Sequence, residues 1–120
     1  MIITFHSLDN EGNKVFFKSE AEIIGKYFIF DDKSQENTKI KLMYDTSSIN
    51  IERIGNTNMK IHLLLDEITN SKYSNSLGLK FDFKVKTNEL DIKSNKLYAM
   101  YDLILDENVI STHKIWIIFN

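Results

Sequence analysis

"KLYAMYDLILDENVISTHKIWIIF" (residues 96–119) contains two runs of alternating apolar and polar residues joined by a short acidic turn. Alternation with a period of two is typical of β-strands that bury one face. In the first run the odd positions from Leu97 to Leu105 share one face. "LKFDFKVK" (residues 79–86) alternates in the same way just upstream. The stretch therefore predicts consecutive antiparallel strands, whose apolar faces must match across each hairpin turn.

The strand upstream of this stretch is predicted to contain a β-bulge. A two-residue turn at Ser94–Asn95 brings the apolar faces on its two sides together. The match is lost toward Val85, because the apolar positions change parity between Val85 and Leu90. One extra residue at Thr87–Asn88, opposite Tyr101, restores the match, and one inserted residue defines a β-bulge.

The last hairpin has two interpretations. A three-residue loop, Asp106–Asn108, pairs Leu105 with Val109 and places His113 opposite Tyr101 on the inner face. The inner face of the last strand then consists of Val109, Ser111, His113, Ile115, Ile117 and Phe119. A four-residue loop instead turns inward Ile110, Thr112, Trp116 and Ile118. We adopt the three-residue loop, which brings Tyr101 and His113 together beside the bulge, where functional side chains are often found.

Arg53 is the single arginine of the chain, and it has the strand parity of Ile49 and Ile51. An odd-numbered loop such as Gly55–Thr57 matches this face to an apolar partner strand and places Arg53 beside Met59. We therefore expect Arg53 on the inner face at a barrel end. Its methylenes would follow the core and its guanidinium would lie near solvent, as a candidate anion contact at the mouth of a pocket.

The rest of the chain is also predicted to form strands, at residues 2–8, 14–24, 26–30, 39–45, 48–54, 59–65 and 89–93. Ser19 and Glu22 have the spacing of a helix capping box, but few residues follow before the next strand. Residues 66–78 lack alternation, so we allow at most one short helical turn near 66–73. The prediction is one all-β domain, residues 1–120: a meandering antiparallel barrel of about 8–10 strands, with a sandwich as the alternative.

Composition excludes several classes of site. The net charge is −2 with interspersed charges, so no nucleic-acid partner is expected. There are no cysteines, and the three histidines lack HxH or HExxH spacing, so no metal site is expected. No phosphate-binding glycine motif occurs, so no cofactor is expected. No signal peptide or run of roughly 18 apolar residues occurs, which predicts a cytoplasmic protein that does not bind membranes.

Tyr101 and His113 are the main candidate site residues, because a phenol and an imidazole on one inner face can orient a polar ligand or act as acid and base. The alternative is a buried pair that satisfies its own hydrogen bonds. We add Arg53 and Thr87 as further candidate ligand contacts. No catalytic residue is assigned, and an enzyme is the least expected class.

"RIGNTNM", "SKYSNSLG", "KVKT", "KLYAMYDLIL" and "STHKIWIIF" follow one another in an order that resembles the YwiB-like family of small uncharacterised bacterial proteins. The resemblance covers residues 49–119. The matching residues are Arg53, Gly55, Met59, Tyr73, Gly78, Thr87, Tyr101, Asp102 and His113. It implies a calycin-like, or lipocalin-like, β-barrel with an internal cavity. The stretch at 44–49 is short, which predicts a trimmed family strand or hairpin and leaves barrel closure open.

The function expected from these features is small-ligand binding or regulation, with a small apolar or amphipathic ligand in a largely apolar interior. Such pockets combine an apolar lining with a few polar groups. The alternative is a protein-interaction module or homodimer, acting through a strand edge or an exposed apolar face.

Overall fold

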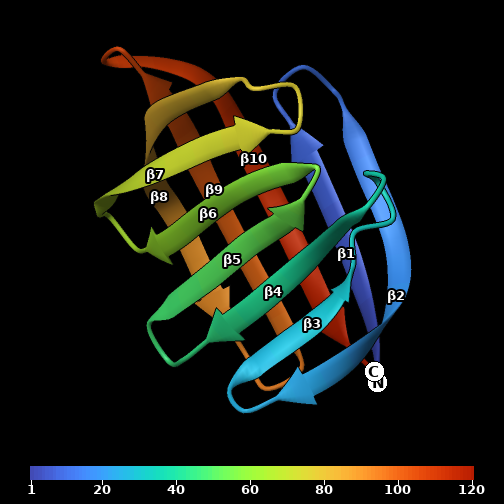
Figure 1. Cartoon of the computed structure of the whole chain (residues 1–120). Coiled ribbons are helices and arrows are strands. Elements are labelled where there is room, and N and C mark those ends of the chain that lie inside the picture. Colours follow the sequence, from blue (N-terminus) through green and yellow to red (C-terminus); the bar gives the residue numbers. More distant parts are fainter.

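Ten antiparallel strands and no helix make up the protein in the computed structural model, which describes residues 1–120 (Figure 1). Each strand pairs with its neighbour in sequence, and β10 pairs with β1, so the sheet is a closed barrel. The strands are β1 (Ile2–Asp9), β2 (Lys14–Ile24), β3 (Tyr27–Asp31), β4 (Thr38–Tyr44), β5 (Ser48–Gly55), β6 (Thr57–Leu64), β7 (Ile68–Asn75), β8 (Lys80–Ile92), β9 (Lys96–Leu105) and β10 (Asn108–Phe119).

The predicted all-β antiparallel barrel is confirmed, and its sandwich alternative is excluded by closure. The stretch with the capping-box spacing is part of β2, and residues 68–75 form β7 in place of the permitted helical turn. The short region at 44–49 opens no gap, because Asp45 makes a compact turn. Its carboxylate accepts hydrogen bonds from the main-chain N–H groups of Ser47 and Ser48, each at 2.8 Å. The chain has no helix that is long and apolar enough to cross a membrane.

The predicted bulge in β8 is confirmed. Leu90 pairs with Ala99 and Thr87 pairs with Tyr101, and the register shifts between Thr87 and Glu89. Because the extra residue is absorbed there, the apolar side chains before and after the bulge point into the same interior.

The predicted three-residue loop between β9 and β10 is wrong. Asn108 pairs with Leu105 across a two-residue turn, and both turn residues, Asp106 and Glu107, have positive φ. Such turns fit the twist of a hairpin. The extra residue lies instead in a second bulge, between Val109 and Ser111, so Val109 pairs with Ile104 and is 58% exposed. Val109 is therefore not on the inner face.

The second bulge nevertheless restores the predicted register over the rest of β10. His113 pairs with Tyr101 and Ile115 pairs with Ala99. The barrel interior holds one cluster of 19 buried apolar residues drawn from all strands except β7. At the end of the barrel that contains both chain termini, this core finishes in an aromatic group of Phe28, Tyr44 and Phe119 (Figure 1).

Candidate functional site

Arg53 points into the barrel, as predicted, and pairs with Met59 across the β5–β6 hairpin. The end of its guanidinium reaches solvent, as expected, because neither Nη atom is among the buried atoms that lack a hydrogen-bond partner. Arg53 Nε donates a hydrogen bond of 3.0 Å to Asp32 Oδ2, and the two side chains are 15% and 0% exposed. Arg53 therefore forms a largely buried ion pair, whose charges are stable there only because each compensates the other.

Asp32 is the site residue that the sequence interpretation missed. It directly follows β3 and has the inward parity of Phe28 and Phe30, although acidic residues at turns are usually solvated. Its other oxygen, Oδ1, accepts hydrogen bonds from Ser34 N at 3.0 Å and Ser34 Oγ at 2.5 Å. The parity of β3 was the signal that could have identified Asp32 as a buried partner for an inward arginine.

Most hydrogen-bond donors of Arg53 remain unused. A guanidinium carries five N–H bonds, and the Nε bond to Asp32 is the only hydrogen bond that it makes within the protein. The guanidinium carbon lies 5.9 Å from the ring centroid of Phe5, which itself stacks on Phe17 at 5.1 Å. Both rings belong to the apolar core, and the two Nη groups are free to bind an acceptor.

Thr87, Tyr101 and His113 form a row on the inner wall, because they are register partners across β8, β9 and β10. The rings of Tyr101 and His113 stack with centroids 5.3 Å apart and planes 16° apart. The alternative of a hydrogen-bonded Tyr–His pair is thus not realised; the two rings pack face to face. All three residues adjoin the β8 bulge, as the sequence predicted.

The hydroxyl of Tyr101 is kept protonated. Burial raises the pKa of Tyr101, and the positive charge of Arg53 only partly opposes this effect. No hydrogen bond to a protein group contributes to the shift. Tyr101 is therefore a neutral donor inside the barrel, close enough to Arg53 to feel its charge.

His113 is the solvent-facing member of the row, since its side chain is only partly buried. Burial lowers the pKa of His113; the carboxylates of Asp9 and Asp102 oppose this shift, and Arg53 adds to it. The imidazole is therefore neutral near pH 7. Its Nε2 lies 2.8 Å from Ser111 Oγ.

Asp9 pairs with His113 in the β1–β10 register, which raises the question of a Ser–His–Asp arrangement. The carboxylate of Asp9, however, accepts hydrogen bonds from Glu11 N, Asn13 N and Asn13 Nδ2, at 2.9, 3.0 and 2.9 Å. Asp9 thus closes the β1–β2 turn and does not orient the imidazole as the third member of such a triad.

Thr87 Oγ1 is a buried side-chain oxygen with no hydrogen-bond partner, in a residue that is 0% exposed. Orphaned buried hydroxyls are uncommon, because an unmade hydrogen bond costs about 1–3 kcal/mol. We refer to Asp32, Arg53, Thr87, Tyr101 and His113 together as the polar cluster. The structure places Thr87, Tyr101 and His113 side by side, and the charge of Arg53, paired with Asp32, acts on Tyr101 and His113.

The two main pockets of the protein lie outside the polar cluster. One follows the outer wall over β6–β8, and the other lies near the β2–β3 turn. Neither is lined by a member of the polar cluster. His62 lies on the outer wall in the first pocket, and His6 stacks on Trp116 at 4.9 Å. No group of three or more His, Cys, Asp or Glu side chains converges anywhere in the chain.

Comparison with known proteins identifies the family. The family described as "Domain of unknown function (DUF1934)" matches residues 3–117. The crystal structure of the YwiB protein from Bacillus subtilis is similar, with a TM-score of 0.69 and 18% identity over 97% of this chain and 88% of that chain. At this identity the likeness shows the fold alone. None of the curated proteins compared with the chain is similar to it. The predicted YwiB-like resemblance is thus confirmed, and the chain belongs to the DUF1934 family of unknown function.

Proposed function

We propose that the protein is a cytoplasmic small-ligand-binding barrel and that the polar cluster is its ligand site. The ligand is a small amphipathic molecule with an acidic group. Arg53 binds the acidic group, Thr87 and Tyr101 donate hydrogen bonds to it, and the partly exposed His113 forms the entrance. The roles follow from the chemistry of each group: Arg53 carries only donors, and the hydroxyls of Thr87 and Tyr101 can each donate one hydrogen bond.

The observation that carries this proposal is the unused donor capacity of Arg53. The side chain is 15% exposed, but only one of its N–H bonds is used by the protein. The two Nη groups are not buried, so they are accessible to a ligand, and a planar guanidinium binds carboxylate or phosphate oxygens in pairs. The free hydroxyls of Thr87 and Tyr101 supply two further donors in the same region.

The surroundings of the polar cluster limit the size of the ligand. Phe5 lies against Arg53, and Phe5 and Phe17 fill the interior beneath it. A long apolar tail therefore has no channel into the core, so the apolar part of the ligand is short. It would contact Met59 and Leu103, which are partly buried against the core.

Binding can be tested by thermal unfolding and calorimetry with a series of monocarboxylates, from acetate to benzoate. We expect saturable stabilisation of the wild type by at least one of them, and loss of this binding in Arg53→Gln. Lys18→Gln, a change of the same type on the exposed outer face of β2, serves as the control. Native mass spectrometry of protein purified from its own host would show whether an acidic ligand is retained.

Two results would count against this function: equal binding by wild type and Arg53→Gln, or no stabilisation by any member of the series together with no retained ligand. Thr87→Val separates a specific site from simple charge attraction. It keeps every charge, so it weakens only a ligand that bonds the hydroxyl, by about tenfold for one lost hydrogen bond of roughly 1.4 kcal/mol.

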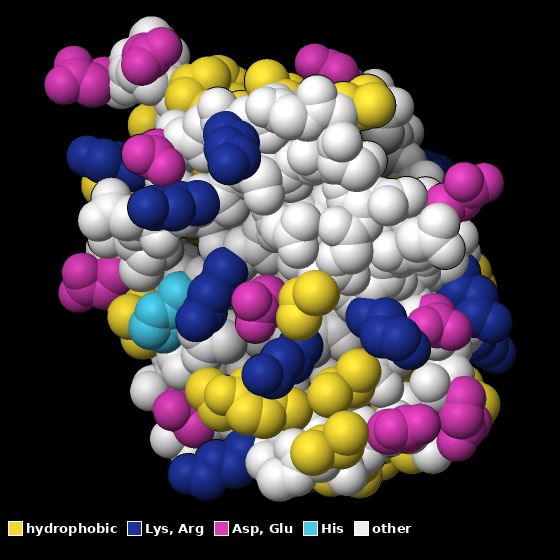
Figure 2. Space-filling model, viewed as in Figure 1, with side chains coloured by type: hydrophobic (Ala, Val, Ile, Leu, Met, Phe, Trp, Pro, Cys, Tyr) yellow, Lys and Arg dark blue, Asp and Glu magenta, His cyan; other side chains and the backbone are white.

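Self-association is the second candidate function, and the β7–β8 turn favours it. Leu77, Leu79 and Phe81 are 92%, 55% and 36% exposed on and beside this turn. Figure 2 shows hydrophobic side chains along the upper edge of the molecule. Because the barrel is closed, such contact would use these side chains and not a free strand edge. Light scattering of wild type and Leu77→Ser at high concentration tests it, and a monomer in both would exclude it.

A further inference from the structure

The pairing of β6 with β7 stops halfway along the two strands. The register contains Thr57–Asn75, Asn58–Ser74 and Met59–Tyr73 and then ends, although both strands continue. Beyond this point the hydroxyl of Ser71 donates to the carbonyl of Lys60, and the hydroxyl of Thr69 donates to the carbonyl of His62 at 2.7 Å. Side chains of β7 thus replace the main-chain ladder.

This replacement displaces two main-chain donors. In a continuous antiparallel ladder with this register, the N–H groups of Lys72 and Asn70 would donate to the carbonyls of Lys60 and His62. Those carbonyls are instead bonded to hydroxyls. The Lys60–Lys72 and His62–Asn70 pairs are absent from the β6–β7 register, so the ladder is incomplete there, and the N–H groups of Asn70 and Lys72 face the resulting gap between the strands, here called the slot. Unpaired main-chain donors of this kind favour an external acceptor.

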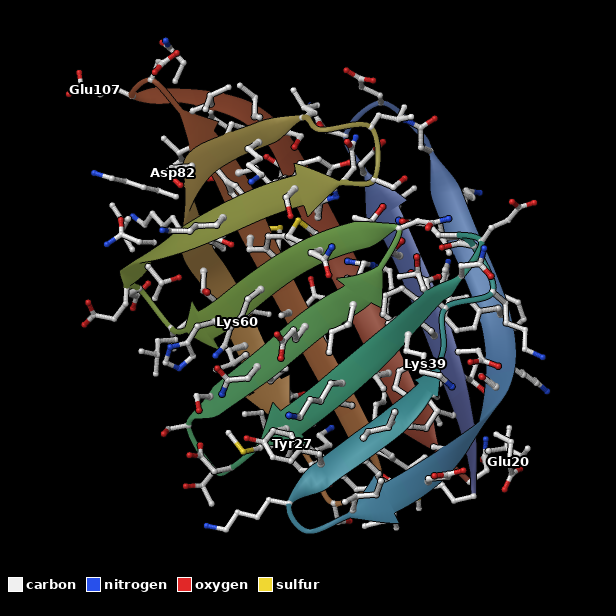
Figure 3. All side chains as sticks on the ribbon, in the orientation of Figure 1. Glu20, Tyr27, Lys39, Lys60, Asp82 and Glu107 are labelled. Carbon is white, nitrogen blue, oxygen red and sulfur yellow. The ribbon has the colours of Figure 1, made fainter.

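The slot forms the floor of a groove of about 980 Å³ on the outer wall. Ser71 and Phe83, which belong to the inner face, are among its lining residues, so the groove extends into the wall. Figure 3 shows Lys60, Asp82 and Glu107 along the same side of the barrel, from β6, β8 and the β9–β10 turn. A volume of this size is typical of sites for small molecules.

Cations surround the slot. Lys60, Lys72 and Lys84 line the groove, and none of them belongs to the four ion pairs of the protein. Figure 2 shows a histidine beside basic side chains on this side of the surface, and His62 is the histidine of the groove lining. The amide groups of Asn50 and Asn70 add further donors. The acidic residues of the groove are Asp82, Asp106 and Glu107.

We propose that this outer groove binds a phosphorylated polyhydroxy compound, with the phosphate over the β6–β7 slot. The phosphate would accept hydrogen bonds from the main-chain N–H groups of Asn70 and Lys72 and from the three lysine ammonium groups. Asp82, Asp106 and Glu107 accept hydrogen bonds from the hydroxyl groups of the ligand. Ile68 and Ile104 provide the apolar part of the lining.

The geometry favours a small molecule over an inserted peptide strand. The slot is closed at one end by the Met59–Tyr73 pair and at the other by the short connection between Leu64 and Ile68. The strands cannot separate enough to admit a third strand, because both ends are tied. A compact anion requires no such separation.

Amide hydrogen exchange and NMR titration test this proposal directly. In the free protein, the amides of Asn70 and Lys72 should exchange faster than the paired amides of β8 and β9. Ribose 5-phosphate should shift both resonances saturably and slow their exchange, and inorganic phosphate should do so more weakly. Lys72→Gln and Lys84→Gln should each weaken binding about fivefold, an effect in the range measured for one exposed charge contact.

Three variants make the test specific. Lys18→Gln on β2 and Lys114→Gln on β10, two exposed lysines outside the groove, should leave binding unchanged. Asp82→Asn should weaken ribose 5-phosphate but not inorganic phosphate. The proposal is overturned if the two amides are already protected in the free protein. It is also overturned if they do not shift with either probe, or if acetate shifts them as strongly as phosphate does.

Discussion

The two ends of the barrel interior are built on the same alternation but closed by different chemistry. At one end Phe28, Tyr44 and Phe119 pack with ring centroids 5.0 to 6.0 Å apart. At the other, inward positions carry the ion pair of Arg53 with Asp32 and the free hydroxyl of Thr87. The aromatic end stabilises the fold by burying apolar area. The polar cluster instead retains buried polar and charged groups whose desolvation costs free energy, which selection for stability alone would not favour.

The largest effect is expected at the aromatic end. Phe119→Ala removes a ring that touches both Phe28 and Tyr44, and should lower the free energy of unfolding by about 4 kcal/mol. Urea unfolding measures this loss. Phe16→Ala is the matched control, because Phe16 is 64% exposed on the outer wall and should cost well under about 1 kcal/mol. Equal costs would show that the aromatic end does not close the core.

Breaking the buried ion pair should give the next largest effect. Asp32→Asn leaves the guanidinium of Arg53 largely buried without a countercharge and should cost about 3 kcal/mol in urea unfolding. The double variant with Arg53→Met removes both charges and should recover much of that loss. If the double variant is as unstable as the sum of the two single variants, the two side chains are not energetically coupled.

The fold was predictable because strand parity and turn spacing are local. The β8 bulge, the Arg53–Met59 pair and the Tyr101–His113 pair all followed from matching apolar faces. The β9–β10 turn was not predictable in detail. A three-residue loop and a two-residue turn plus one bulge shift the register equally, so the apolar pattern beyond Ser111 cannot distinguish them.

The site was only half predictable. Parity placed Arg53, Tyr101 and His113 on the inner face, but it does not say which inward residues meet across the interior. The partner of Arg53 lies 21 positions away, at the end of β3, and acidic pairs at turns are usually solvated. The β6–β7 slot carried no sequence signal, because the hydroxyls of Thr69 and Ser71 are ordinary on a strand.

A smaller effect on stability is expected from substitutions of Thr87, whose hydroxyl we propose is needed for ligand binding but not for folding. Thr87→Val replaces the unpaired hydroxyl by a methyl group of similar size, so the free protein should gain about 1 kcal/mol of stability. Thr87→Ser keeps the hydroxyl, loses a buried methyl and should be destabilised. Thermal or urea unfolding separates the two. A destabilised Thr87→Val would indicate that the hydroxyl has a partner, such as a bound water, in the folded protein.

The smallest expected effect is a pH dependence that comes from His113. Burial holds the pKa of His113 in the folded protein below its ordinary value of 6.5. As the pH falls below that value, the unfolded chain takes up a proton that the folded protein does not, so stability is lost on acidification. The charged form would also be repelled by Arg53, although Asp9 and Asp102 partly offset this.

Urea unfolding between about pH 5 and 8 should show this loss of stability on acidification. His113→Gln should reduce the slope of stability against pH more than His62→Gln on the outer wall does. An unchanged slope in His113→Gln would mean that the polar cluster accommodates the imidazolium, which would make the polar end far more hydrated than its buried ion pair indicates.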